Sequence, residues 1–192
     1  MGCKFHIEHW QKTGKSPTSD ELAEALNNTD AAIAWQSFNA EYWEMQALLH
    51  YYQALHNYHS DNQNGFASST ELAANGYREA IRMRPNWPYS WANLALMKAS
   101  VNQFDTEYEQ AINQAVMLGP WENAVNISVA EAGMLGWSTL TPDTQAAVMK
   151  NIERGIKRNN GVLKKRLSAI NKLGLACLYL QGSKARKRLC GF

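Results

Sequence analysis

Two histidines near the start of the chain, His6 and His9, are spaced so that they could bind a metal ion. Residues three apart lie on one face of a helix, so two imidazoles at this spacing could hold a metal ion together. The HExxH arrangement of zinc proteases does not occur, however, and the sequence offers no third ligand beside the pair. The pattern therefore predicts an exposed polar face and no metal site. His50, His56 and His59 are likewise interpreted as groove or surface residues.

The sequence patterns of common enzymes do not occur either. The chain has no GxGxxG pattern for a dinucleotide, no complete GxxxxGK[ST] loop for phosphates and no GxSxG pattern around a catalytic serine. Paired carboxylates such as Glu107 and Glu109 stand two residues apart and would diverge on a helix. The sequence therefore predicts a non-enzymatic protein without a cofactor.

The three cysteines, Cys3, Cys177 and Cys190, match neither a zinc-ligand spacing nor a CxxC motif. Cys177 and Cys190 stand on either side of the Gly-Ser turn at residues 182–183. They could meet in a disulfide if the chain doubles back there, and this bond would indicate an oxidising compartment. Two idle or buried thiols are the alternative interpretation, and the sequence leaves both open.

Charge divides the chain into an acidic front part and a basic end. Residues 1–149 carry seven Lys or Arg against sixteen Asp or Glu, whereas residues 150–192 carry twelve Lys or Arg against Glu153 alone. Such asymmetry suggests an anionic partner, for example a membrane surface or an acidic polymer. A solvated helical face that pairs with the acidic front part is the alternative. The residues assigned to the anionic-partner patch are Lys164, Lys165, Arg166, Arg186, Lys187 and Arg188.

Apolar residues recur at helical spacing along most of the chain. One helix face, for example, would carry the residues at spacings of three, four and seven from Tyr77, which are Ala80, Ile81 and Arg84. Sustained alternation of apolar and polar residues, which would indicate strands, is missing. The sequence therefore predicts an all-α fold. Helix starts are expected at residues 16–21, 70–71 and 141–143, where Ser, Thr or Asp can cap a helix.

Two prolines, Pro85 and Pro120, mark an internal repeat of 35 residues. Small and aromatic residues precede both prolines at the same distances, which predicts two similar helices that pack in the same way. The residues of this pattern are Ala73, Tyr77 and Ala80 before Pro85, and Tyr108, Ile112 and Ala115 before Pro120.

This pattern resembles the tetratricopeptide repeat, an antiparallel pair of helices of about 34 residues. Small residues let the two helices approach closely, large apolar residues fill the space between them, and a proline comes after the second helix. The residue before a proline is forced out of helical geometry, so the chain turns there. The resemblance implies an α-solenoid of antiparallel helix pairs, in which residues 84–88 separate two repeats and a C-terminal helix pair caps the array.

The chain is expected to form a single repeat domain over residues 1–192. Residues 1–58 would hold a degenerate N-terminal repeat, and residues 59–69 a polar, mobile insertion loop. The best-defined repeats would occupy residues 70–157, with a basic capping region at 158–192.

Repeat arrays bind their partners along the concave face that the first helices of the pairs form. The resemblance therefore implies a groove for a protein or peptide partner, aromatic and weakly polar in character. Helix packing is the alternative role for Trp43 and Tyr51. The residues assigned to this groove are Trp43, Ala47, His50, Tyr51, Tyr89, Asn93, Leu96, Ile127 and Glu131.

Four segments carry a closer resemblance: RPNWPYSWANLALMKA (84–99), LGPWENAV (118–125), IERGIKR (152–158) and RLCGF (188–192). Together with HWQKTGKSPTSDEL (9–22), they resemble the VpsP-type proteins of bacterial exopolysaccharide synthesis, which are small tetratricopeptide proteins of biofilm-matrix gene clusters. The resemblance implies an accessory role at the periplasmic face of the inner membrane, with a hydrophobic anchor upstream of this region. Without the resemblance, a cytoplasmic location would be expected.

These observations favour two functions from different classes. The first is a scaffold that binds a protein or peptide partner. Other components of a polysaccharide synthesis or export system are the expected partners. The alternative is a direct binder of an anionic polysaccharide or a membrane surface through the basic C-terminal region. A nucleic acid is not expected, because aromatic residues do not alternate with the basic ones in that region.

Overall fold

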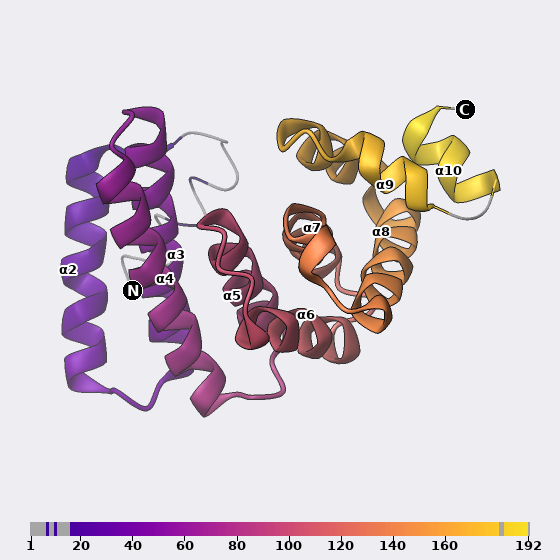
Figure 1. Ribbon diagram of the computed structural model, residues 1–192. Helices are drawn as coiled ribbons and strands as arrows, with labels where there is room; N and C mark the ends of the chain where they lie inside the picture. Colours follow the sequence, from indigo (N-terminus) through magenta and orange to yellow (C-terminus); the bar gives the residue numbers. More distant parts are fainter. Residues whose placement is uncertain (1–6, 8–9, 11–15, 181–182, 192) are drawn as a thin grey trace. The chain divides into compact units, whose positions relative to one another are not determined.

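The computed structural model describes residues 7, 10, 16–180 and 183–191, and these residues form helices without any β-strand (Figure 1). The predicted all-α class is therefore confirmed. The chain divides into two compact units, Met1–Pro85 and Asn86–Phe192, which we call unit 1 and unit 2. The boundary falls inside the segment 84–88, where the sequence predicts a junction. His6, His9 and Cys3 lie outside the described residues.

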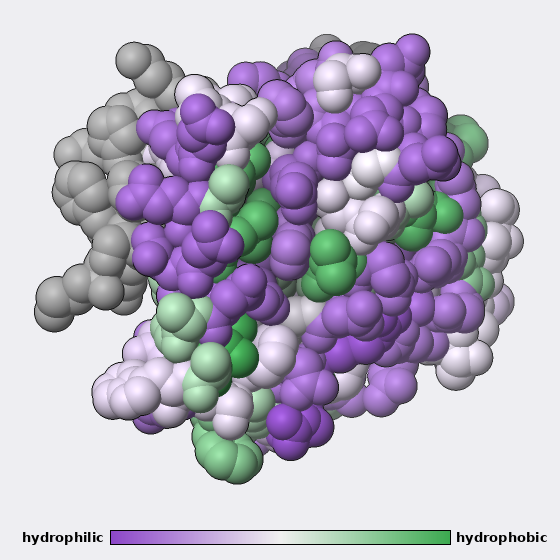
Figure 2. Space-filling model, turned by 90° about the vertical axis from the view of Figure 1, so that its left-hand side faces the viewer, coloured by the Kyte–Doolittle hydropathy of each residue, from purple (hydrophilic) through white to green (hydrophobic). Residues whose placement is uncertain are grey.

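Unit 1 contains the helices α2 (Ser19–Trp35), α3 (Ala40–His59) and α4 (Gln63–Met83), with α3 packed against both of the others. Helix α2 begins with a capping box in which Thr18 and Glu21 each accept a hydrogen bond from the other's backbone N–H. Much of the surface that Figure 2 shows is hydrophilic, with smaller groups of hydrophobic residues between. The core that joins α2 to α3 consists of Ile7, Trp10, Leu22, Ala25 and Leu49.

The polar segment at residues 59–69 is mostly helical, which corrects the predicted insertion loop. Helix α4 begins at Gln63, because the Asn62 side chain accepts a hydrogen bond of 3.0 Å from the backbone N–H of Gly65 and caps the helix. Thr70, an expected helix start, lies inside α4 instead. Its hydroxyl donates to the Phe66 carbonyl at 2.8 Å and is buried there.

Unit 2 contains helices that pack consecutively along the chain. Helix α5 packs against α6 and α7, α7 packs against α8, and α8 packs against α9 and α10. The expected helix start at residues 141–143 is confirmed, since the Thr141 side chain accepts a hydrogen bond from the Thr144 N–H. The elements of unit 2 are α5 (Pro88–Ser100), α6 (Thr106–Leu118), α7 (Asn123–Leu135), the 3-10 turn η1 (Trp137–Thr139), α8 (Pro142–Ala169), α9 (Leu173–Tyr179) and α10 (Ser183–Cys190).

Small residues bring consecutive helices close together in both units. In unit 1, a Cβ atom added to Gly76 of α4 would lie 2.9 Å from the Cβ of Ala47 on α3. In unit 2, a Cβ atom on Gly133 of α7 would lie 2.7 Å from the side chain of Val148 on α8. Neither position has room for a larger residue. The apolar residues that the proline alignment singled out are all buried: Ala73, Tyr77, Ala80, Tyr108, Ile112 and Ala115.

The prolines of the repeat pattern come directly after helix ends, as predicted. Arg84 caps the C-terminus of α4 with φ −132° and ψ 70°, and Gly119 caps α6 with φ −122° and ψ 48°. Each of these residues precedes a proline, whose ring disfavours helical geometry in the residue before it. The same sequence feature therefore produces the same change of chain direction in both places.

Helix α8 contains a similar break at Asn159, although the next residue is not a proline. The backbone of Asn159 has φ −153° and ψ 71°, which is not helical. Its side-chain oxygen accepts a hydrogen bond of 3.3 Å from the Val162 N–H, so Asn159 acts as the N-cap of a new helical segment. We therefore treat α8 as a first segment, residues 142–158, and a second segment, residues 160–169.

Candidate partner-binding face

Helices α5 and α7 meet along a face on which the predicted groove residue Asn93 is a direct neighbour of Ser128. The Ser128 hydroxyl on α7 donates a hydrogen bond of 3.3 Å to the side-chain oxygen of Asn93 on α5. The two residues are 35 positions apart, which is the interval between the prolines. Both side chains are half-buried, as is Ile127 beside Ser128. Two positions separated by the interval between the prolines thus lie side by side in unit 2.

A buried carboxylate extends this face from α7 to the second segment of α8. Glu131 forms an ion pair of 2.7 Å with Arg166, and its side chain is only 12% exposed. Burial raises the pKa of the Glu131 carboxyl, while the charge and hydrogen bond of Arg166 act in the opposite direction. Arg166, which the sequence assigns to the anionic-partner patch, is therefore engaged with Glu131, although its side chain stays 39% exposed.

Aromatic residues and a carboxylate lie together at the start of α5 and α7. The Tyr89 hydroxyl donates a hydrogen bond to a carboxylate oxygen of Glu122, the N-cap residue of α7. This bond raises the pKa of Tyr89 to about 12, with burial and the charge of Glu122 as smaller causes. The ring of Tyr89 also contacts Trp87, at 5.1 Å between centroids. Trp87 remains 40% exposed, which leaves an aromatic surface beside the face.

The predicted groove residues divide between the units, four in unit 1 and five in unit 2. Two of them, Ala47 and Leu96, are buried, so they cannot line an open groove. Ala47 is covered by the close approach of Gly76. The indole N–H of Trp43 donates to the Ser37 carbonyl at 2.9 Å.

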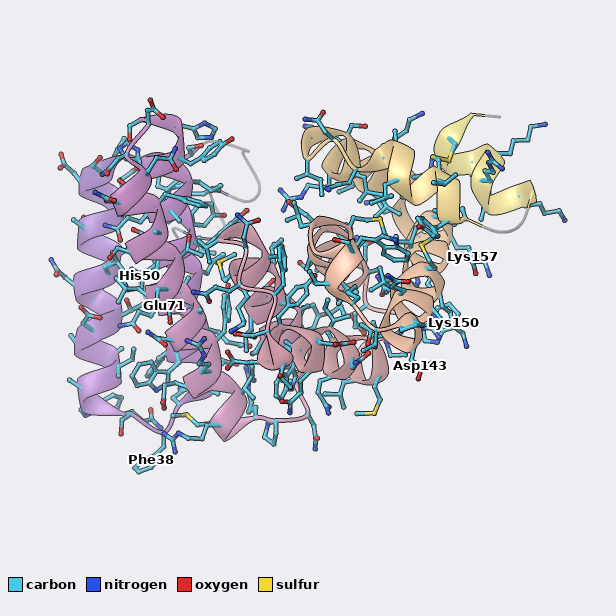
Figure 3. The ribbon with its side chains drawn as sticks, viewed as in Figure 1. Phe38, His50, Glu71, Asp143, Lys150 and Lys157 are labelled. Atoms are coloured by element: carbon cyan, nitrogen blue, oxygen red, sulfur yellow. A yellow bond between two sulfur atoms is a disulfide. The ribbon has the colours of Figure 1, made fainter. Side chains whose placement is uncertain are left out.

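His50 and Tyr51 complete the unit 1 set and are both half-buried on α3. His50 lies within 3.3 Å of the Gln53 side chain, and burial lowers the pKa of its imidazole. His50 is therefore mostly neutral near pH 7. It can serve as a hydrogen-bonding group on α3, in keeping with its interpretation as a groove or surface residue (Figure 3).

The basic residues of the C-terminal region lie on two different elements. Lys164 and Lys165 are exposed on the second segment of α8, and Arg186, Lys187 and Arg188 are exposed on α10. Lys187 and Arg188 line a pocket between α10 and the first segment of α8, while Lys164 and Lys165 do not. The predicted patch therefore draws on two elements, and only its α10 part lines this pocket.

A disulfide joins Cys177 of α9 to Cys190 of α10, with their Cα atoms 6.0 Å apart. The bond ties α10 to α9 within unit 2. Of the two interpretations that the sequence left open, the structure has the bonded one. Cys177 is also buried, so its sulfur is shielded from solvent.

Sequence reasoning missed two buried polar groups. The ammonium of Lys98 lies 2.8 Å from Asp105 and 2.6 Å from Glu107, with the lysine side chain only 3% exposed. Burial lowers the pKa of Lys98, but both carboxylates raise it more, so the lysine stays charged. The sequence signal for this buried charge was a lysine inside the otherwise apolar run 94–99.

The second missed group is a pair of fully buried asparagines between α7 and α8. Asn126 donates a side-chain hydrogen bond of 2.7 Å to the side-chain oxygen of Asn151, and Asn151 donates one of 2.9 Å to the Asn126 carbonyl. Asn126 lies 35 residues after Trp91, so the two residues hold the same position relative to Pro120 and Pro85.

Within the described residues, no three His, Cys, Asp or Glu side chains cluster as they would around a metal ion. No helix among those residues combines the length and the apolar character needed to cross a bilayer. Comparison with models of protein families gives no match to this sequence, and none of the curated proteins matches it either.

Proposed function

We propose that the protein is a non-enzymatic scaffold of the tetratricopeptide type, which binds a segment of a partner protein along α5, α7 and the second segment of α8. The observation that carries this proposal is the hydrogen bond between Asn93 and Ser128. It joins equivalent positions of consecutive helix pairs, as expected on the shared face of a repeat array.

The recurring helix ends support the repeat architecture. Arg84, Gly119 and Asn159 leave the helix with similar backbone angles, and each precedes the start of another helical segment. Close packing through Gly76 and Gly133 fits helix pairs of the same kind. In this architecture the first helices of the pairs in unit 2 are α5, α7 and the second segment of α8.

The chemistry of the face indicates what kind of segment it would hold. Asn93 and Ser128 carry neutral groups that can both donate and accept hydrogen bonds, which suits the backbone amides of an extended peptide. Ile127 offers an apolar contact beside them. Glu131 and Arg166 present an ion pair that would favour a polar or dipolar side chain at the next position.

The sequence resemblance to VpsP-type proteins suggests the cellular setting. We propose an accessory role in bacterial exopolysaccharide synthesis or export, with components of that machinery as partners. The disulfide between Cys177 and Cys190 fits an oxidising compartment such as the periplasm, where such bonds persist. The aromatic surface at Trp87 lies beside the face and could widen the contact with a partner.

Selection from a phage-displayed library of random 12-residue peptides would test this function. Peptides enriched on the wild-type protein are expected to bind it and to lose at least about tenfold in affinity for Asn93→Asp, because the new carboxylate replaces an amide donor on the face. Gln110→Glu on α6 is the matched control, since it makes the same amide-to-carboxylate change at an exposed position on a helix outside the proposed face. Equal affinity for Asn93→Asp and Gln110→Glu would contradict the proposal.

A further inference from the structure

We propose that the pocket between α8 and α10 is a binding site for a phosphate group carried on a small organic body. The pocket has a volume of about 490 Å³. Its lining combines the cations Lys157, Lys184, Lys187 and Arg188 with the apolar side chains Ile156 and Ala185. Lys157 projects from the first segment of α8 (Figure 3), and the other three cations come from α10.

The residues that line the pocket carry an excess of positive charge. All four cations are exposed, and Glu153 is the sole carboxylate in the lining. Of the residues that the structure describes, none forms an ion pair with Lys157, Lys184, Lys187 or Arg188. Four cations around one carboxylate leave a net positive charge beside the pocket, and an anion bound there would reduce the repulsion between them.

A phosphate fits this lining better than a carboxylate does. It carries up to two negative charges and at least three acceptor oxygens, whereas a carboxylate offers one charge and two oxygens. The guanidinium of Arg188 can bind two phosphate oxygens at once, and the three lysines act as point charges around it. Ile156 and Ala185 offer contacts to the organic part of the ligand, so we expect a phosphate ester to bind more tightly than free phosphate.

Three contacts fix the α10 wall of the pocket in place. The Cys177–Cys190 disulfide ties the end of α10 to α9. Leu189 of α10 is fully buried, and the Asn160 side chain on α8 donates a hydrogen bond of 3.0 Å to the Arg188 carbonyl. The backbone that carries the cations is therefore held in place before a ligand arrives, which reduces the entropic cost of binding.

Calorimetric titration of the full chain with inorganic phosphate and with glycerol 3-phosphate tests this site directly. Saturable binding is expected, tighter for the ester, and weakened at least about tenfold by the double variant Lys184→Ala/Lys187→Ala. Lys164→Ala/Lys165→Ala is the matched control, because it removes two exposed lysines of the same region that lie outside the pocket. Circular dichroism would verify that both variants keep the helical content of the wild type.

Flotation with vesicles identifies the source of the phosphate. Binding to vesicles of phosphatidylglycerol and phosphatidylcholine that depends on Lys184 and Lys187 would indicate a lipid headgroup, whereas binding of soluble esters alone would indicate a free metabolite. Both results support the site. Equal weakening by the two double variants, or binding of an acidic polysaccharide but of neither phosphate nor its esters, would overturn it. Loss of phosphate binding would leave peptide binding by α5 and α7 unaffected.

Discussion

The Asn93 and Ser128 side chains lie 35 residues apart in sequence, yet a hydrogen bond of 3.3 Å joins them across α5 and α7. Their separation equals the interval between Pro85 and Pro120, so the contact connects one position of the repeat with its own counterpart. Side chains that are one 35-residue interval apart therefore lie next to each other on the surface formed by α5 and α7.

Replacing Gly76 by alanine should destabilise the protein. The added methyl group would lie 2.9 Å from Ala47 Cβ and 3.1 Å from the Trp43 carbonyl oxygen, so α3 and α4 would have to separate. Overpacking of this kind costs about 1–3 kcal/mol, which exceeds the gain of up to about 1 kcal/mol in helix propensity. Urea denaturation measures the difference. Gly161→Ala is the control, since nothing lies within 4 Å of that position, and it should be neutral or stabilising.

The buried amides of Asn126 and Asn151 should show strong energetic coupling. Each asparagine satisfies a polar group of the other, at 2.7 Å and 2.9 Å, in a place that water does not reach. Replacing either asparagine by alanine removes a hydrogen-bond partner of the other and should lower the free energy of unfolding by about 1–3 kcal/mol. Replacing the second asparagine in that variant should lower it much less. A double-mutant cycle of denaturation free energies measures this coupling. Additive effects would show that the two amides act independently.

Reduction of the Cys177–Cys190 bond should lower the free energy of unfolding by about 3 kcal/mol, the magnitude expected for a loop of this length. Denaturation with and without dithiothreitol, in a Cys3→Ser background, gives the value. The Cys177→Ser/Cys190→Ser variant should match the reduced protein and no longer respond to the reductant. A protein whose stability is unchanged by reduction would show that the bond does not constrain α10.

The hydrogen bond between Tyr89 and Glu122 should be visible as a delayed titration. The pKa of Tyr89 in the folded protein is about 12, above the ordinary value near 10. Because the pKa is raised in the folded protein, the hydrogen bond of Tyr89 stabilises the fold fully below pH 10, and this stabilisation is lost as the pH rises through 12. Difference absorbance of the phenolate, wild type against Tyr89→Phe, isolates this titration. Glu122→Gln should shift its midpoint back toward 10, and an unchanged midpoint would point to another cause.

The helices and their junctions could be predicted because their signals are local. Proline after Arg84 and after Gly119 ends each helix through steric exclusion, and the small residues Ala80 and Ala115 recur at fixed distances from it. The break at Asn159 escaped prediction because it depends on a side-chain cap without a proline.

The side chains of the face were harder to predict, because their surroundings come from residues distant in sequence. Ala47 was assigned to an open groove, but it is buried by Gly76, 29 positions later. Arg166 was assigned to a basic patch, but it pairs with Glu131 on another helix. A helical period tells which residues share a helix face, but it does not tell which other helix covers that face.

The most direct test of the central claim is to map where a selected peptide lies on the protein. A library-derived peptide with a benzophenone at its centre would be photo-crosslinked to the full chain, and the linked residues identified by mass spectrometry. We predict crosslinks to α5 and α7 around Asn93 and Ile127, suppressed in Asn93→Asp. Crosslinks confined to α6 or to the first segment of α8 would contradict the account.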